Sequence, residues 1–276
     1  NSSAKAHTKK SSEEFAERKL EPEAPPLYFY SYLKGTSQLR RTNMISGETS
    51  IHPIRNYTFN YCSWCELPSE DILFTGGMEL DYQRVSDVVS ICGKSFEATQ
   101  KPHMISARAL HATIYHNNYV YVISGTLFAS MCERLSLRET QWESLQPLPQ
   151  KADRFAAVLL KATQCIYVAC GGCDEYEQID IIQRLDLERL EWSVMPIKLP
   201  VPNHEITGFK QSESKFGIAV DGSYIYSFNA LTESITYLKE TDVNISFPLG
   251  PCYYDRGYFY GFINGEVIRL ELGPLE

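Results

Sequence analysis

Two pairs of cysteines in this chain have the spacing that zinc sites use. They are Cys62-x-x-Cys65 and Cys170-x-x-Cys173, and thiolates at that spacing can fill two corners of a tetrahedral zinc site. Structural zinc sites bring their two pairs within about 15–20 residues of each other, whereas these pairs lie more than a hundred residues apart. The sequence therefore favours small, reduced core residues over metal ligands, and we expect no bound metal or other cofactor.

Arginine and histidine side chains are the next candidates for chemistry. His111 and His116 have the residue type of an acid or base, and Arg108 lies three positions before His111. Strand alternation would put Arg108 and His111 on opposite faces, and an arginine at this place would pack between neighbouring sheets equally well. The sequence has no Ser-His-Asp, His-Glu-x-x-His or phosphate-loop pattern, so we assign no catalytic residue.

Two acidic segments each carry a tyrosine. They are residues 78–84 and 173–180, and both follow a pair of glycines. Tyrosine and arginine dominate the energetics of protein interfaces, and complementary charge selects the partner. One hypothesis is a face for a basic or arginine-bearing partner; ordinary solvated loops would have the same composition. The candidate contact residues are Tyr82, Arg84, Arg108, Arg154, Asp174, Glu175, Tyr176 and Glu177, with the tyrosines as anchors.

The elements that position these residues are short strands. From residue 27 onward, runs rich in Tyr, Val, Ile and Phe alternate with Gly, Pro, Asn and Asp, which is typical of strands and turns. One apolar strand recurs, and the glycines that follow it fall at positions 77, 125 and 172, a period near 48. Its six copies are residues 27–32, 72–77, 120–125, 167–172, 215–220 and 258–263.

A second segment repeats after this strand. Residues 133–142 match residues 183–192 at an offset of fifty, and Trp142 and Trp192 each follow a leucine by seven positions. A period of roughly 40–50 residues with about four strands per unit is typical of a β-propeller, because one such sheet cannot bury both faces alone.

The order of these parts resembles the kelch repeat, notably in residues 108–125 and 154–172. The double glycine is complete only at Gly76-Gly77 and Gly171-Gly172 and is Ser124-Gly125 in one copy. The resemblance implies an all-β fold, a kelch-type β-propeller of about six four-stranded blades over residues 26–276. In our register the first copy lacks its innermost strand and the last lacks its outermost. Either the termini complete one shared blade or two blades stay incomplete.

Residues 1–25 differ from this pattern. Ser11 and Ser12 precede an acidic run that ends at prolines, and a serine N-cap with acidic residues in the first turn predicts a short exposed helix. We expect this N-terminal extension to be a helical linker or the tail of an upstream element.

Composition narrows the range of partners. The formal net charge of −8 argues against a general nucleic-acid binder, because phosphate neutralisation needs an excess of Lys and Arg on one face. The longest apolar runs are far shorter than the 18 or so residues that span a bilayer, so we expect no membrane insertion. The cysteines, most of them in apolar strand-like runs, fit a reduced, cytoplasmic protein.

The resemblance to kelch proteins implies a non-catalytic protein–protein interaction module, a scaffold or adaptor. Such modules associate with the cytoskeleton or select substrates for a ubiquitin ligase. The alternative is a propeller enzyme that acts on a sugar-like substrate in the central tunnel, for which Arg108 and Arg154 are the inner-strand candidates. That alternative requires convergent His, Arg and carboxylate groups with perturbed pKa values.

Overall fold

A computed structural model describes residues 28–125, 130–152, 155–170, 179–203, 206–242, 252–255, 257–263 and 266–273. Every helix or strand in this part of the chain is a strand, so the fold is all-β there, as the repeats predict. Accordingly, no helix in the described residues could cross a membrane. The short helix expected within residues 1–25 falls outside the described residues.

Three sheets have four strands in antiparallel order, each formed by consecutive segments of the chain. The first of these comprises β4 Ser63–Glu66, β5 Ile72–Thr75, β6 Val88–Ile91 and β7 Ala98–Lys101. The next comprises β8 Ala112–His116, β9 Tyr119–Ile123, β10 Cys132–Ser136 and β11 Glu143–Ser144. The third comprises β12 Ala156–Leu160, β13 Cys165–Ala169, β14 Ile179–Asp186 and β15 Glu191–Asn203.

The remaining strands form a three-stranded sheet and a seven-stranded sheet. The N-terminal sheet comprises β1 Tyr28–Tyr32, β2 Gln38–Asn43 and β3 Thr49–Pro53. A seven-stranded sheet joins β16–β19 to β20–β22 through one parallel pair, Lys210 with Tyr253. Its strands are β16 Ile206–Lys210, β17 Lys215–Val220, β18 Tyr224–Asn229, β19 Ser234–Glu240, β20 Tyr253–Asp255, β21 Tyr258–Ile263 and β22 Glu266–Glu271.

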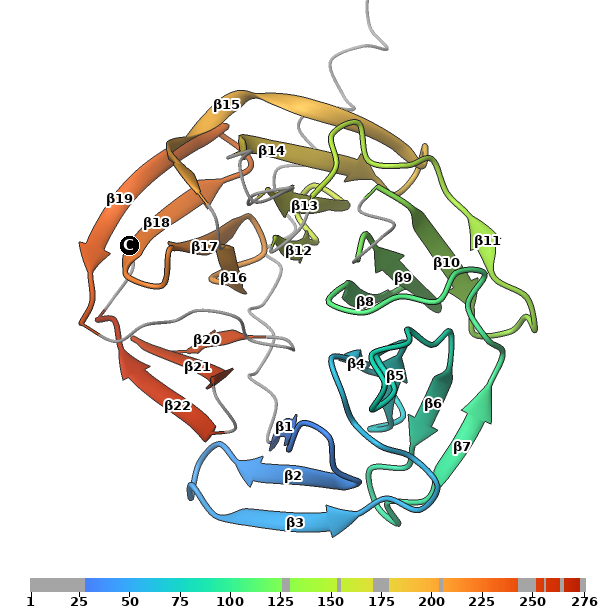
Figure 1. Ribbon diagram of the computed structural model, residues 1–276. Coiled ribbons are helices and arrows are strands. Elements are labelled where there is room, and N and C mark those ends of the chain that lie inside the picture. The colour runs from blue at the N-terminus through green and yellow to red at the C-terminus, as the bar shows by residue number, and fades with distance from the viewer. Residues whose placement is uncertain are drawn as a thin grey trace, which may run out of the picture.

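The groups of strands lie in chain order around one axis (Figure 1). The first strand of each group is nearest the axis and its last strand lies at the rim. This is a propeller-like arrangement. The recurring apolar strand is the second strand of the four complete groups, namely β5, β9, β13 and β17. Its first copy, β1, begins its group, and its last copy, β21, is followed only by β22 among the described residues. In the described part of the chain, each terminal group therefore has three strands: β1–β3 form a sheet of their own, and β20–β22 pair with β16.

Five clusters of buried hydrophobic side chains lie between consecutive groups of strands. Trp64 and Phe74 belong to the cluster between the first and second groups. Tyr167 and Phe228 belong to the cluster between the fourth and fifth. The four groups in the middle of the chain thus bury both of their faces against their neighbours, which accounts for the apolar repeats of the sequence.

The two repeated tryptophans have the same role in successive groups. The indole N–H of Trp142 donates to the carbonyl of Pro102 at 2.9 Å, and that of Trp192 donates to the carbonyl of Gln146 at 3.0 Å. In both cases the acceptor lies after the last strand of the preceding group or next to it in sequence. The tryptophan therefore ties each rim strand to the group before it.

The paired-glycine position also has a repeated conformation. Gly76 and Gly77 have φ of 54° and 120°, and Ser124 and Gly125 have φ of 59° and 115°. A Cβ atom on Gly77 would lie 2.7 Å from the carbonyl oxygen of Asn60. A Cβ atom on Gly76 would lie even closer to the carbonyl oxygen of Arg108, so neither position of this copy has room for a side chain, although Ser124 occupies the first position of the next copy. Gly171 and Gly172 fall outside the described residues.

Candidate interaction surface

Residues 78–84, which follow Gly77, form a hydrogen-bonded turn between β5 and β6. Met78 and Arg84 form an antiparallel bridge at its base. Above the bridge, the amide of Glu79 donates to the carbonyl of Gln83 at 2.7 Å, and the amide of Tyr82 donates to the carbonyl of Glu79 at 3.0 Å. We call this segment the 78–84 turn. Its backbone is closed internally, so its tip has a defined shape.

The tip of the 78–84 turn presents an apolar and an aromatic side chain to solvent. Leu80 is 77% exposed and Tyr82 is 71% exposed. Tyr82 has a φ of 67°, a left-handed conformation that is uncommon for a bulky residue. Glu79 and Asp81 are exposed beside them. The tip therefore combines a hydrophobic contact surface with two carboxylates.

Neighbouring loops hold the base of the 78–84 turn. The amide of Met78 donates to the carbonyl of Asn60 at 2.8 Å, and the side-chain amide of Asn60 donates to the carbonyl of Met78 at 3.1 Å. The amide of Gly77 donates to the carbonyl of Arg108 at 2.8 Å. The turn is thus supported by the segments that enter β4 and β8, which lowers the entropy that a partner must remove on binding.

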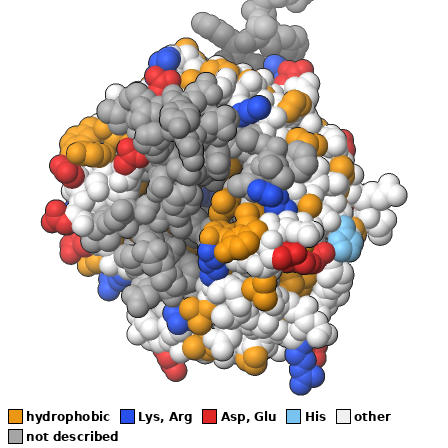
Figure 2. Space-filling model, viewed as in Figure 1, with side chains coloured by type: hydrophobic (Ala, Val, Ile, Leu, Met, Phe, Trp, Pro, Cys, Tyr) orange, Lys and Arg blue, Asp and Glu red, His pale blue; other side chains and the backbone are white. Residues whose placement is uncertain are grey.

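Figure 2 shows one face of the ring. Apolar side chains gather near its centre, and basic and acidic side chains lie beside them. A mixed surface of this kind, with apolar area next to charges of both signs, is typical of non-obligate protein interfaces.

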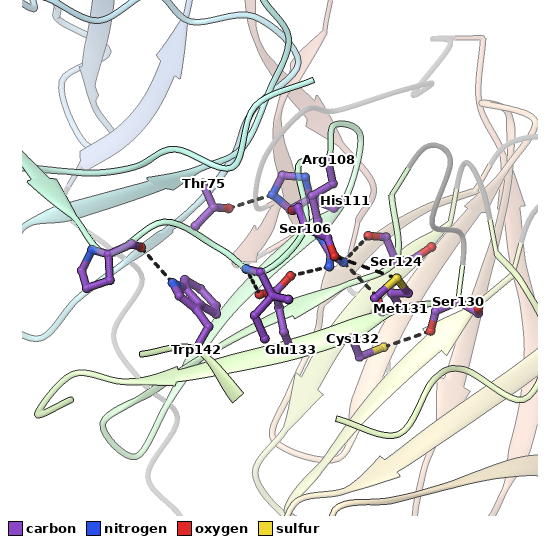
Figure 3. A network of polar contacts seen from close by, with 12 residues as sticks. Thr75, Ser106, Arg108, His111, Ser124, Ser130, Met131, Cys132, Glu133 and Trp142 are labelled. Atoms are coloured by element: carbon purple, nitrogen blue, oxygen red, sulfur yellow. Dashed lines mark hydrogen bonds and ion pairs between the residues drawn. The ribbon is translucent and has the colours of Figure 1, made fainter. Parts of the chain in front are cut away.

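Arg108 belongs to the interior instead. Its side chain is fully buried and forms an ion pair with Glu133, itself 1% exposed. Its guanidinium also donates to the carbonyls of Ser124 at 2.8 Å and Met131 at 2.9 Å (Figure 3). Arg108 therefore has no exposed surface to offer a partner in this structure, and it joins the segment before β8 to β9 and β10.

His111 is part of the same buried region. Its Nε2 lies 2.7 Å from the hydroxyl of Thr75, which in turn lies 2.6 Å from the hydroxyl of Thr113. Burial, with the charge of Arg108 as a smaller cause, lowers the pKa of His111 to about 3. The imidazole is therefore neutral at physiological pH, and its contacts join β5 to β8.

Strand alternation does not apply to Arg108 and His111, because β8 begins at Ala112 and both residues precede it. His116, at the end of β8, lies 3.0 Å from the side-chain carbonyl oxygen of Gln164. The two histidines named by the sequence thus contact residues of different sheets and do not form one site.

The cysteines of the first pair point into different clusters. Cys62 packs between the first and second groups of strands, and Cys65 packs between the second and third. Burial raises the pKa of both thiols, that of Cys62 to about 12. Among the described residues, no group of three or more His, Cys, Asp or Glu side chains is placed to hold a metal ion. Cys173, of the second pair, falls outside them.

Of the remaining candidate contact residues, only Arg84 lies among the described residues. Arg84 is partly buried at the base of the 78–84 turn. The others, Arg154, Asp174, Glu175, Tyr176 and Glu177, lie outside the described residues. Of the eight candidate contact residues, the structure therefore places Tyr82 and Arg84 on one turn and Arg108 in the interior.

Two features of the structure were missed by sequence reasoning. Leu80 was not singled out, although an apolar residue inside an acidic turn is a usable signal. The other feature is a hydrogen bond of 2.9 Å from the hydroxyl of Tyr253 on β20 to the carboxyl of Glu66 on β4, across 187 positions. Burial raises the pKa of Glu66 to about 7. Only the place of Glu66 at the end of an apolar run hints at its partial burial.

A scan of the sequence against models of known protein families finds no match, and a search of curated proteins finds none either.

Proposed function

We propose that this chain is a kelch-type β-propeller of six blades that acts as a non-catalytic protein–protein interaction module. The sequence resemblance of residues 108–125 and 154–172 to the kelch repeat supports the family. The six groups of strands around one axis support the blade count (Figure 1). The terminal groups would then be two blades of three strands each.

The observation that carries the proposed function is the exposed pair Leu80 and Tyr82 on the 78–84 turn. An aromatic side chain on a supported backbone gives a large contact area at low entropic cost. The carboxylates of Glu79 and Asp81 beside it favour a partner that presents Lys or Arg around an apolar pocket. The sequence of Asp174, Glu175, Tyr176 and Glu177 predicts a second acidic contact segment with a tyrosine.

In this proposal the ring is a rigid support that holds a bound protein on its connecting loops, as a scaffold or adaptor does. Cytoskeletal association and substrate selection for a ubiquitin ligase in the cytoplasm are the roles that the kelch resemblance implies. The alternative, an enzyme with a sugar-like substrate in the central tunnel, has less support, because Arg108 is already paired with Glu133.

Affinity enrichment from the native source tests the proposal. We expect the double variant Leu80→Ala/Tyr82→Ala to lose at least one partner that the unaltered protein recovers. The matched control is Leu231→Ala/Tyr237→Ala, which removes another exposed leucine and tyrosine, 66% and 53% exposed, from around β19. It should retain the partner. Equal recovery by both variants, with unchanged melting temperatures, would exclude the 78–84 turn as the contact.

Changing the acidic charges tests the proposed basic partner independently. Reversal of Asp174, Glu175 and Glu177 to lysine should weaken recovery of a basic partner, and added salt should weaken binding of the unaltered protein. Recovery that responds to neither change would contradict a basic partner while leaving an apolar one in place.

A further inference from the structure

The contact between the last and first groups of strands differs from the other five. The five apolar clusters all lie between groups that follow one another in the chain. Where the last group meets the first, Phe29 on β1 and Tyr253 on β20 meet edge to face, with ring centroids 6.0 Å apart. Tyr253 also reaches past β1 to Glu66 on β4, with its hydroxyl 2.9 Å from the carboxyl oxygen. We call these contacts the seam.

These residues face the seam because side chains alternate between the two faces of a strand. On β4, Trp64 packs toward the first group and Cys65 toward the third, so Glu66 faces the side of the first group again. On β1, Tyr30 and Tyr32 pack toward the second group, which leaves Phe29 on the opposite face with Tyr253. Tyr253 of the last group therefore contacts one side chain from each of the first two groups, Phe29 and Glu66.

The seam is also incompletely paired. Ser31 is fully buried, shares the Phe29 face of β1, and its hydroxyl has no hydrogen-bond partner among the described residues. The hydrogen bond of Tyr253 to Glu66 is a polar contact between the last group and β4 in this part of the chain.

We propose that the Tyr253–Glu66 hydrogen bond is the clasp that closes the ring, and that ionisation of Glu66 loosens it. The clasp holds the seam while the carboxyl is neutral. Opening would hydrate the carboxylate and free β20 from β4.

The surroundings of Glu66 favour its neutral form. The titratable groups that interact electrostatically with Glu66 are Tyr253 from the last group, Tyr30 from β1 and Cys65 on its own strand. All of them are neutral at pH 7 because burial raises their pKa values.

Cations and histidines on the neighbouring elements are engaged elsewhere. The guanidinium of Arg41 on β2 lies over the ring of Tyr28 at 4.5 Å and also interacts with the side chain of Tyr30. On β16, Lys210 is the register partner of Tyr253, and its ammonium is ion-paired with Glu213 at 2.6 Å. On β8, Tyr115 packs against the cluster that contains Cys65, between the second and third groups, and His116 bonds to Gln164.

Burial and the hydrogen bond act on Glu66 in opposite directions. Burial raises the pKa of Glu66, the hydrogen bond from Tyr253 lowers it, and burial prevails to give a value of about 7. Between pH 6 and pH 8 the carboxyl therefore passes from mostly neutral to mostly ionised.

Hydrogen–deuterium exchange at pH 6 and pH 8 tests the clasp. After correction for intrinsic exchange, peptides covering β20 and β21 should lose up to about tenfold in protection at pH 8, because one titrating group with this pKa changes an opening equilibrium by that factor. In Glu66→Gln, protection of these peptides should not change between the two pH values. Peptides from β8–β10 serve as the internal reference for global stability.

Two further variants complete the design. Tyr253→Phe removes only the hydroxyl and should lower protection at β20 and β21 at both pH values. Glu70→Gln alters a carboxylate that is 72% exposed and should behave like the unaltered protein. The proposal is overturned if Glu66→Gln keeps the full pH response, or if Tyr253→Phe is as well protected as the unaltered protein at pH 6. A fall in protection at β8–β10 without one at β20 and β21 would likewise overturn it.

Discussion

At the scale of single residues, the buried ion pair of Arg108 and Glu133 has the largest expected effect on stability. Both side chains are almost fully removed from solvent, and the second carboxylate oxygen of Glu133 accepts from the amide of Ile105 at 2.7 Å. Removing one member of such a pair leaves the other charge buried without compensation. The pair therefore fixes the entry into β8 against β9 and β10.

We predict that Glu133→Gln lowers the free energy of unfolding by about 3–5 kcal/mol, because Arg108 keeps its charge in the interior. Urea unfolding at pH 7 measures this difference. The matched control is Glu143→Gln, since Glu143 is ion-paired to Arg134 at 2.8 Å but is 58% exposed; there we expect less than about 1 kcal/mol. Similar losses in the two variants would mean that burial does not determine how much an ion pair contributes to the free energy of unfolding.

The sequence indicated that Arg108 matters but could not show why. The kelch resemblance and its place near a strand made it a candidate, whereas its partner Glu133 lies 25 positions later, on β10. A surface contact and an interior ion pair have the same sequence pattern. Burial decides between them, and burial depends on how neighbouring sheets pack.

At the scale of elements, the paired-glycine turn connects the core to the proposed interaction surface. Gly77 lies between β5 and the 78–84 turn, and its approach to the carbonyl of Asn60 leaves no space for a side chain. The hydrogen bonds of Asn60 to Met78 then support the turn. Any shift at Gly77 is therefore expected to disturb the placement of Leu80 and Tyr82.

We predict that Gly77→Ala lowers the free energy of unfolding by more than about 2 kcal/mol, because it adds a backbone clash to the strain of a positive φ. Gly35→Ala is the matched control: Gly35 has a φ of 72° with nothing within 4 Å of an added Cβ, so we expect a loss of about 1–2 kcal/mol from φ alone. Thermal and urea unfolding of both variants checks the difference. Equal losses would contradict the close approach at Asn60.

Strands differ in how well the sequence predicts them. The recurring apolar strand was predicted at residues 72–77 and 120–125 and is confirmed as β5 and β9, because burial on both faces leaves a continuous apolar run. The rim strand β7 is exposed at all four residues, and β11 has only two residues. Such strands carry no apolar pattern, so their existence follows only from pairing with a neighbour.

At the scale of the whole molecule, ring closure is the feature that sequence reasoning left open. The repeats predicted copies that each contact the next, and such contacts are local in the chain. The contact of Tyr253 with Glu66 joins residues 187 positions apart. No periodic signal marks such a pair, because it depends on the summed rotation of all the sheets about the axis.

Glu66 and His111 give the folded molecule opposite responses to pH. The pKa of Glu66 is raised from 4.5 to about 7 on folding, so its stabilisation is complete below pH 4.5 and is lost as pH rises through 7. The pKa of His111 is lowered from 6.5 to about 3, so its stabilisation is complete above pH 6.5 and is lost as pH falls toward 3. Each slope amounts to up to about 1.4 kcal/mol per pH unit.

Between pH 4.5 and pH 6.5 these two slopes oppose each other, and we predict that their contributions to the free energy of unfolding cancel over that range. Glu66→Gln should reveal the response of His111, so that stability rises with pH by up to about 1.4 kcal/mol per unit. His111→Gln should reveal the opposite slope, and the double variant should remove both. Urea unfolding at pH 4.5, 5.5 and 6.5 measures these slopes independently of the absolute stability of each variant. Slopes that match the unaltered protein in both single variants would mean that neither group is held in the protonation state that its burial implies.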